Sequence, residues 1–572
     1  MSVPQADIER DPVAAASRPR GSTPGGRARA ESGWHRALAL ETREATFLHW
    51  IAVGLVVGAI FVPRLLPCVD YPQHLALSDV ARRLMNPEAP EHSEYVLNVF
   101  TYNGLFHLVV AWISLHLPIE LAGRLVVAAS LIGMATAVLA LLRTLGRPLT
   151  YAALFTPVLF SFSLGWGFAN YAMASAIAAW ASVFVARSAM RPSWGAAAAV
   201  AILGFACAFA HVLAMIILCV FAAALALELS WRSEPAQRFG ARGWLRVVAR
   251  TTLALLPLLV GCLYCIAVYH RQYTWDPNMY RDPTIEGSAP PLWQKAAFFG
   301  SFALDLFGDA TDQIVLWVVI GVMAWAVFAA RKGRRGSGEP VDVPPPVVAP
   351  FVAMTLAYFA TPMVLIGTHL IFPRLGQWLV LAAVLATPRM PDAVASRASR
   401  YILRLGLVGG ANLFAHCVLF AWETNDASAV IDDLPPGGAA TAVIWDPWTI
   451  AFRNGTLTHL AAYYGARKHG QWAFAFARYL SVPVRFKPNS QPAWPARGWE
   501  FEGEAYDPRC AYARAFPLVI IKAPSDIARD GSGESMVRRL VFKKDAPSVR
   551  LLSHHGRFWA FDSSGLPGDG VL

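Results

Sequence analysis

The most regular feature of the chain is the return of long apolar runs up to residue 422, with short polar loops between them. A run of about 20 apolar residues matches the length of a helix that crosses a lipid bilayer. The pattern therefore predicts eleven membrane-spanning helices, at 45–66, 119–142, 149–166, 170–187, 194–209, 211–230, 250–269, 312–330, 349–367, 375–388 and 403–422.

After residue 422 the long apolar runs stop and charged residues return. The stretches "TAVIWDPW" and "PLVIIKAPS" predict buried strands, "SVRLLSHHGRFWAFD" alternates like a strand, and "LTHLAAYYGARKHGQWAFAFARYL" predicts an amphipathic helix. About 150 residues suffice to bury a separate core. The expected fold class is an all-α polytopic membrane bundle at 45–422 with a small C-terminal α/β domain at 423–572. Residues 1–44, rich in Pro, Gly, Ala and Arg, are expected to form a disordered tail.

Composition narrows the class further. Only 15% of the residues are charged and the mean hydropathy is +0.42, whereas a soluble chain carries about 25% charged residues. The formal net charge of +11 does not indicate nucleic acid, because the basic residues cluster in short loops between apolar runs. There they set the orientation in the membrane and contact anionic lipid.

The basic loops also predict the topology. Loops such as "RTLGRPLT" and "RKGRRGSGEP" are expected on the cytoplasmic side, together with the N-terminus. The loop 67–118 and the C-terminal domain are then outside the cytoplasm. The apolar stretch 102–117 is not counted as a span, because a twelfth crossing would place "RTLGR" outside. We expect it to lie on the outer leaflet or dip into it.

This topology gathers the chain's unusual polar groups on the outer side. They are Asp70 and His74 in "DYPQHL", Asn170 and Tyr171 in "GWGFANY", His211, Trp275 and Asp276 in "YTWDPNMYRD", and His369 and Arg374 in "GTHLIFPRLGQW". Polar groups near lipid are costly and tend to be functional or buried. Each also has a simpler explanation. Asp70 can cap the following helix, His74 and His211 can be packed imidazoles, Asn170 can satisfy a turn, and Arg374 can reach to the interface.

Several of these stretches resemble the GT-C superfamily of multi-span glycosyltransferases, which take sugar from a polyprenyl-phosphate carrier. The resemblance rests on "PCVDYPQHL" after the first span, the helix in the first outer loop, "GWGFANY", the outer arginine in "FPRLGQW" and the C-terminal outer domain. "DYPQHLA" and "GFANY" are most similar to the bacterial, largely uncharacterised branch.

The resemblance implies a sugar transfer from a polyprenyl-phosphate donor to an envelope glycan, lipid or protein on the outer side. Asp70 or His74 would act as the base for the acceptor hydroxyl, and Arg374 would bind the lipid phosphate. Asn170, Tyr171, His211, Trp275, Asp276 and His369 would contact substrate. No cofactor is required by this assignment, but a divalent metal stays open, since many members have paired acids where Asp70 has no adjacent partner. No D-x-D motif or phosphate loop indicates a nucleotide sugar.

Two other classes stay open from the sequence. A transporter requires ionisable groups inside the membrane, and only His416 lies near the centre of a predicted span. A non-catalytic envelope protein would use the bundle to anchor the outer domain. A separate hypothesis concerns Cys68 and Cys510, which fall in the predicted outer segments and are expected to form a disulfide.

Overall fold

A computed structural model gives the arrangement of the chain. It describes residues 40–566 apart from 234–239, 276–289, 338–345, 365–368, 480, 493, 496–497 and 528. Most of the tail predicted at 1–44 therefore lies outside the described residues. From Leu40 onward the chain clusters as one unit.

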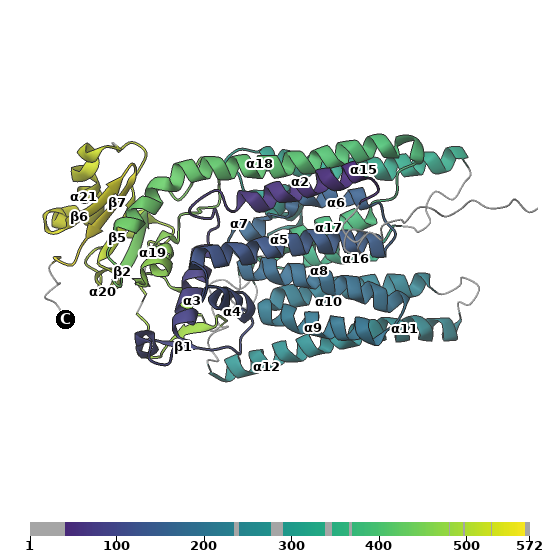
Figure 1. Cartoon of the computed structure of the whole chain (residues 1–572), viewed down its shortest axis with the longest axis horizontal. Coiled ribbons are helices and arrows are strands. Elements are labelled where there is room, and N and C mark those ends of the chain that lie inside the picture. The colour runs from purple at the N-terminus through teal and green to yellow at the C-terminus, as the bar shows by residue number, and fades with distance from the viewer. Residues whose placement is uncertain are drawn as a thin grey trace, which may run out of the picture. The chain divides into compact units, whose positions relative to one another are not determined.

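A bundle of helices that lie alongside one another makes up the larger part of this unit (Figure 1). Its main helices are α2 (Arg43–Ala59), α5 (Ile119–Thr144), α8 (Ala169–Met190), α9 (Trp194–Ala210), α10 (Val212–Arg232), α11 (Ala241–Leu255), α12 (Leu259–Trp275), α15 (Thr311–Ser337), α16 (Ala349–Ala360), α17 (Gly376–Ala386) and α18 (Asp392–Asp433). Among the described residues, six helices are long and apolar enough to cross a membrane. The chain is thus an integral membrane protein, and its number of crossings stays a prediction.

Prolines explain where the helices depart from the predicted spans. The run predicted at 149–166 is broken into short pieces, α6 (Ala152–Phe155) and α7 (Phe162–Gly165), separated by a 3-10 turn that contains Pro157. A second 3-10 turn at Pro257 separates α11 from α12. Proline lacks the backbone N–H that continues a helix and clashes with the preceding turn, so both breaks follow from the sequence.

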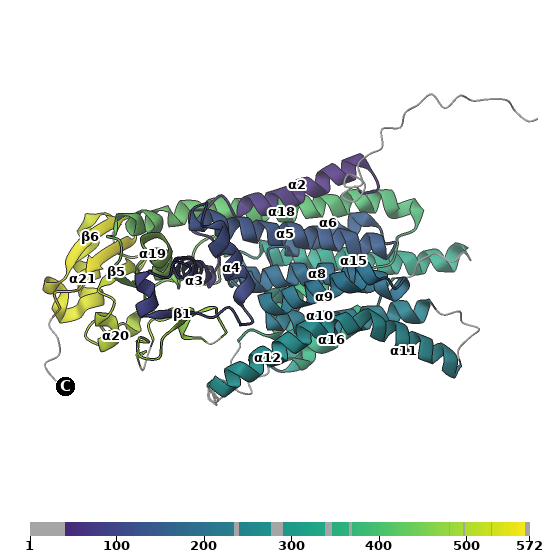
Figure 2. The same cartoon turned by 60° about the horizontal axis from the view of Figure 1, so that its bottom comes forward.

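The longest helix continues past the predicted limits of its span. The apolar run predicted a span at 403–422, but α18 has 42 residues and so measures about 63 Å. It packs along α2 and extends from the bundle to the C-terminal domain (Figures 1 and 2).

The first outer loop contains two short helices, α3 (Tyr71–Arg83) and α4 (Gly104–Ile113). Helix α3 lies across the end of the bundle (Figure 1). Helix α4 has 10 residues and so a length of about 15 Å, half of the roughly 30 Å hydrocarbon thickness. Helices α16 and α17 are similarly short, so whether 102–117 crosses the membrane stays a prediction.

The C-terminal domain is built on a five-stranded sheet with the order β3-β2-β5-β7-β6. The strands are β2 (Ala439–Ile444), β3 (Gln471–Trp472), β5 (Leu518–Lys522), β6 (Arg550–His555) and β7 (Phe558–Asp562). The first three are parallel, and β5, β7 and β6 are antiparallel. The strands predicted in "TAVIWDPW" and "PLVIIKAPS" are confirmed as β2 and β5. The alternating stretch near the C-terminus is a hairpin that turns at Gly556, where φ is +54°.

The long amphipathic helix predicted in this domain is wrong in extent. The α-helix α19 (Leu460–Lys468) ends early, because the backbone turns into the left-handed region at His469 and continues as β3, and a 3-10 turn follows at Phe476–Arg478. In both views α19, α3 and α4 lie between the sheet and the bundle (Figures 1 and 2). A short antiparallel pair of β1 (Tyr95–Leu97) and β4 (Val484–Phe486) also joins the first outer loop to the domain.

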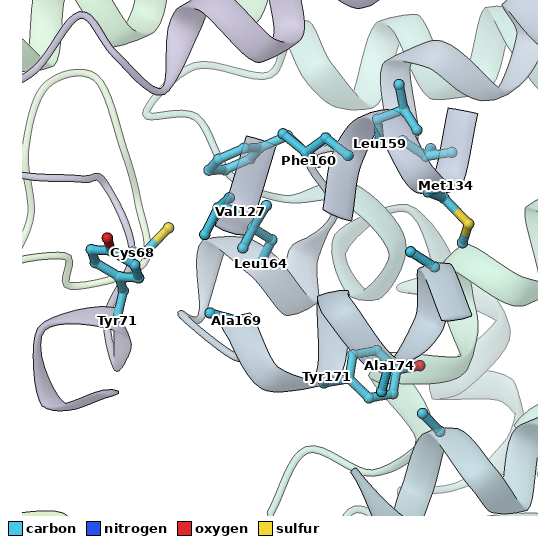
Figure 3. Packing of buried hydrophobic residues seen from close by; sticks show 14 of the residues in the cluster. Cys68, Tyr71, Val127, Met134, Leu159, Phe160, Leu164, Ala169, Tyr171 and Ala174 are labelled. Atoms are coloured by element: carbon cyan, nitrogen blue, oxygen red, sulfur yellow. The ribbon is translucent and has the colours of Figure 1, made fainter. Parts of the chain in front are cut away.

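The buried core reaches from the bundle to the start of α3. Figure 3 shows the Cys68 sulfur pointing toward Val127 and Leu164, with Tyr71 beside it. Cys68 is fully buried and free, and Cys510 is also free, its sulfur accepting the N–H of Ala513. The predicted Cys68–Cys510 disulfide is therefore wrong. Cys68 is a packing residue of the bundle core, and Cys510 packs against the separate core of the C-terminal domain.

Candidate functional site

The backbone brings the two most distinctive sequence stretches into direct contact. The N–H of Asp70 donates to the carbonyl of Trp166 at 3.0 Å, and the N–H of Val69 donates to that of Gly165 at 3.1 Å. Gly167 has a φ of +88°, and a Cβ there would lie 2.3 Å from the Asp70 nitrogen. Only glycine allows this approach. "DYPQHL" and "GWGFANY" are therefore held against each other at the end of the bundle.

The carboxylate of Asp70 faces the C-terminal domain. It makes no capping hydrogen bond to α3, and its Oδ1 lies 3.1 Å from His459 Nε2. His459 is the residue before α19, and its other nitrogen, Nδ1, lies 3.2 Å from Glu500 Oε1. The described structure thus forms a carboxylate–imidazole–carboxylate chain between the first outer loop and the outer domain.

Electrostatics favour a charged imidazole at His459. Burial alone would lower its pKa, but the Glu500 and Asp70 carboxylates outweigh burial, so the pKa of His459 is raised. Burial also raises the pKa of Glu500, with Asp70 adding to the effect and His459 opposing it. Gln73, one turn into α3, packs against Nδ1 of His459 at 3.2 Å and is itself fixed by the Trp472 indole at 2.7 Å.

His74, the second predicted catalytic residue, pairs with a different histidine. Its Nδ1 lies 3.0 Å from Nε2 of His107, and Nδ1 of His107 lies 2.7 Å from the carbonyl of Asn103. A carbonyl only accepts, so Nδ1 of His107 carries its proton and Nε2 accepts from His74. His74 then keeps a lone pair on Nε2. Burial lowers the pKa of His74 well below its usual value, so this imidazole is neutral.

Arg374 lies in a second group of the predicted residues. Its guanidinium stacks on the Phe168 ring, with 3.6 Å from Cζ to the ring centroid, and Nη2 donates to the carbonyl of His369 at 3.0 Å. The Tyr171 hydroxyl donates to the carbonyl of Arg374 at 2.7 Å. Arg374 is only 5% exposed, its Nε has no hydrogen-bond partner, and none of the described carboxylates forms a salt bridge with it. A buried, unneutralised guanidinium is costly unless an anion occupies the site.

His211 adds a second donor beside this guanidinium. Its Nδ1 accepts the N–H of Leu213 at 3.1 Å, so the neutral ring carries its proton on Nε2. That Nε2 lies 3.2 Å from Nη1 of Arg374, and neither N–H can accept from the other. A phosphate oxygen is an acceptor, so it can receive hydrogen bonds from both of these N–H groups.

The two groups belong to one cluster. Phe168, which stacks on Arg374, is two residues after Trp166, whose carbonyl binds Asp70. The charges of Asp70 and Arg374 act on each other electrostatically. His211, His459 and Arg374 each help to lower the pKa of His74.

The remaining predicted residues are less involved. The Asn170 side chain accepts the N–H of Tyr171, which satisfies the backbone at the start of α8. His369 is exposed and contributes its carbonyl. Asp276 and the side chain of Trp275 lie outside the described residues. Among the residues with described placement, no group of three His, Cys, Asp or Glu side chains could hold a metal ion.

Sequence reasoning missed His459 and Glu500. They are 389 and 430 residues away from Asp70, in a domain where charged side chains are common, and nothing in the local sequence sets them apart. The one usable signal is that His459 comes directly before the helix-forming run "LAAYYGARK".

The fold is a helical membrane bundle with a polar cluster next to a C-terminal α/β domain, and comparison with solved structures finds a similar fold. The structure of ArnT from Cupriavidus metallidurans bound to undecaprenyl phosphate matches 92% of this chain and 99% of its own, with a TM-score of 0.50 and 12% identity. The apo structure of the same protein matches the same shares at 12% identity with a TM-score of 0.46. At this identity the likeness shows a shared fold alone, and this fold agrees with the membrane bundle and C-terminal domain that the sequence predicted. No family model and no curated protein matches the sequence.

Proposed function

We propose that the chain is a membrane glycosyltransferase that moves a sugar from a polyprenyl phosphate to an envelope acceptor on the extracytoplasmic side. The observation that carries the proposal is the placement of the part-buried Asp70 carboxylate within electrostatic reach of the buried Arg374 guanidinium, which His211 contacts, at the end of the bundle. The shared fold with ArnT, which was crystallised with undecaprenyl phosphate, supports a lipid-linked donor.

In the proposed reaction, the acceptor hydroxyl attacks C1 of the donor sugar. The new C1–O bond forms as the bond from C1 to the phosphate oxygen breaks, and the polyprenyl phosphate leaves with that electron pair. The hydroxyl proton passes to the Asp70 carboxylate, of which only Oδ1 is engaged by a described residue. His459, held by Glu500, is a positioning residue for this carboxylate. The lone pair on His74 Nε2 is the second candidate base.

The leaving phosphate is the natural occupant of the space beside Arg374 and His211. A guanidinium binds phosphate oxygens through a planar fork, and a buried site strengthens the attraction because water does not screen it. Stacking on Phe168 fixes the plane of the guanidinium, so the fork is oriented before the lipid arrives.

The transporter alternative loses its main support. His416, expected near a span centre, lies against Phe307 and 3.4 Å from Asp309, where the C-terminal domain meets the bundle. His416 thus lies toward the end of the bundle that meets the C-terminal domain, and its position gives no support to an ionisable site midway along the bundle.

The decisive experiment is transfer by purified protein in proteoliposomes with radiolabelled polyprenyl-phosphate sugars. Asp70→Asn keeps the size of the side chain and removes its charge. We expect it to insert at normal abundance and lose roughly 10²-fold or more in transfer rate, the usual effect of removing a general base. Asp526→Asn, an exposed position on the outer domain, is the matched control and is expected to transfer like the parent. Normal turnover by Asp70→Asn would exclude the mechanism.

A further inference from the structure

A second polar site lies at the far end of the contact between α3 and α19. The two helices run side by side in the same direction. Asp70 contacts His459 where each residue directly precedes its helix, and Asp79 within α3 contacts His469 just past the end of α19. Next to this second contact is a cavity of about 780 Å³, which we call the α3–α19 pocket. Besides the ends of these helices, it is lined by the segments that follow α2 and precede α5.

The pocket carries an excess of positive charge. Its lining includes five Arg or Lys residues against three Asp or Glu, an excess of two before His469 is counted. Arg124 donates only to the carbonyls of Ile60 and Arg64, and Lys468 donates to the carbonyl of Asp432. Neither forms a salt bridge with a described carboxylate, so their charges are left for an anion.

Asp79, one of the three acids already counted, is bound by several basic groups at once. It is fully buried and binds Arg82 at 2.7 Å, Arg83 at 3.0 Å and His469 at 2.9 Å. Burial opposes ionisation, but these donors lower its pKa, so the carboxylate stays charged and holds the basic groups in place. The side chain of His469 is half exposed, and its other ring nitrogen is free to face a ligand.

Exposed apolar side chains beside the pocket indicate that the pocket lies at the membrane–water interface. Phe61 and Leu117 line it and are 39% and 37% exposed. Trp112 and Leu115, just before Leu117, are 64% and 51% exposed, and exposed tryptophan is typical of the membrane interface. Leu121 and Leu125 continue the exposed apolar face along the first turns of α5.

We propose that the α3–α19 pocket binds the phosphate headgroup of an anionic membrane lipid, whose acyl chains follow the exposed leucines of α5. A basic cavity above an apolar helix face matches the two halves of such a lipid, and each Lys or Arg near the surface contributes to its attraction. This site is separate from the Arg374 cluster, and the proposal does not depend on transferase activity.

The test is lipid binding by the full purified chain in neutral detergent. Phosphatidylglycerol, phosphatidylcholine and soluble sn-glycerol 3-phosphate are titrated separately, with retained lipid measured by native mass spectrometry and thermal unfolding. The variant Arg64→Gln/Lys468→Gln removes two positive charges from the pocket lining, and neither side chain is fully buried. Arg64 is paired with Asp432 at 3.2 Å in an exposed ion pair, and Arg124 is kept because its guanidinium binds two backbone carbonyls. We expect its apparent Kd for phosphatidylglycerol to rise about tenfold or more.

The matched control is Arg514→Gln/Arg529→Gln, which removes the same charge from exposed positions of the outer domain. It is expected to bind phosphatidylglycerol like the parent. Phosphatidylcholine is expected to bind weakly to the parent and to both variants. Equal loss in the control, or unchanged binding by the pocket variant, would overturn the proposal. Saturation by sn-glycerol 3-phosphate as tightly as by phosphatidylglycerol would overturn the lipid source and indicate a soluble phosphate compound instead.

Discussion

At the scale of single residues, Arg374 depends on the shape of its side chain as well as on its charge. The guanidinium stacks on Phe168, donates to the carbonyl of His369 and meets the His211 donor. A lysine keeps the positive charge but cannot reproduce the planar fork or the stacking. For Arg374→Lys we therefore expect the KM for the lipid donor to rise about tenfold while kcat falls less.

This prediction is checked by steady-state transfer kinetics at varied donor concentration. Arg453→Lys serves as its control, because Arg453 is also paired near the end of the bundle but is 45% exposed and bonded to Asp305. An equal rise in KM in both variants would indicate a general loss of fold rather than a phosphate contact.

His459 makes stability depend on pH in a definite direction. Its pKa in the folded chain is raised above the ordinary value of 6.5. The group therefore contributes stability that is complete below 6.5 and is lost as pH rises through the folded pKa. We expect His459→Gln to unfold at a lower temperature than the parent in acid, with the gap narrowing as the pH becomes alkaline. Thermal unfolding from mildly acidic to alkaline pH tests this, and a gap that widens with pH would contradict it.

Some residues of the candidate site could be predicted from the sequence, and others could not. Asp70, His211 and Arg374 could be recognised because a polar residue beside an apolar run is exceptional, and the structure brings these three into one cluster. His459 and Glu500 could not, because their role arises only when the outer domain packs on α3. A contact across 389 residues leaves no local pattern.

At the scale of elements, the turn before α8 is held by one glycine. Gly167 combines a φ of +88° with a Cβ position only 2.3 Å from the Asp70 nitrogen. Gly167→Ala should cost about 1–3 kcal/mol through backbone strain and displace α3 from the turn. Gly54→Ala is its control, since nothing lies within 4 Å of the added methyl group in α2, and the change should be neutral or slightly stabilising. Thermal unfolding and the transfer rate are measured for both variants, and we expect both quantities to fall in Gly167→Ala but not in Gly54→Ala.

Most predicted spans overlap a helix in the described residues because apolar length is a local property, read directly from consecutive residues, whereas the span predicted at 149–166 is broken at Pro157. The predictions failed where tertiary contacts decide. The stretch after Lys468 has the composition of a helix, but the turn at His469 brings Gln471 and Trp472 beside β2 as a strand.

At the scale of the whole molecule, the ends of the helices sort into two sides. The starts of α2 and α18 and the ends of α5 and α10 lie opposite the end that carries α3, α4 and the C-terminal domain (Figure 1). The basic loops predict that the first side is cytoplasmic. A membrane-impermeant maleimide should therefore label cysteines placed at the exposed positions Val99 and Met536 in intact cells, but not one at Leu245. Labelling at Leu245 from outside would invert the topology.

The paired contacts of α3 and α19 also restrict how this chain can change in evolution. The two aspartates are nine residues apart and the two histidines ten, so both bridges form only while the helices keep their lengths. One inserted residue within α19 would rotate everything after it by about 100° and move it by about 1.5 Å, which separates His469 from Asp79 even when His459 stays on Asp70. Loops elsewhere in the outer domain can grow or shrink without this penalty. Between His459 and His469, the number of residues is therefore constrained in addition to their identity, because the two bridges fix the distance that α19 must span.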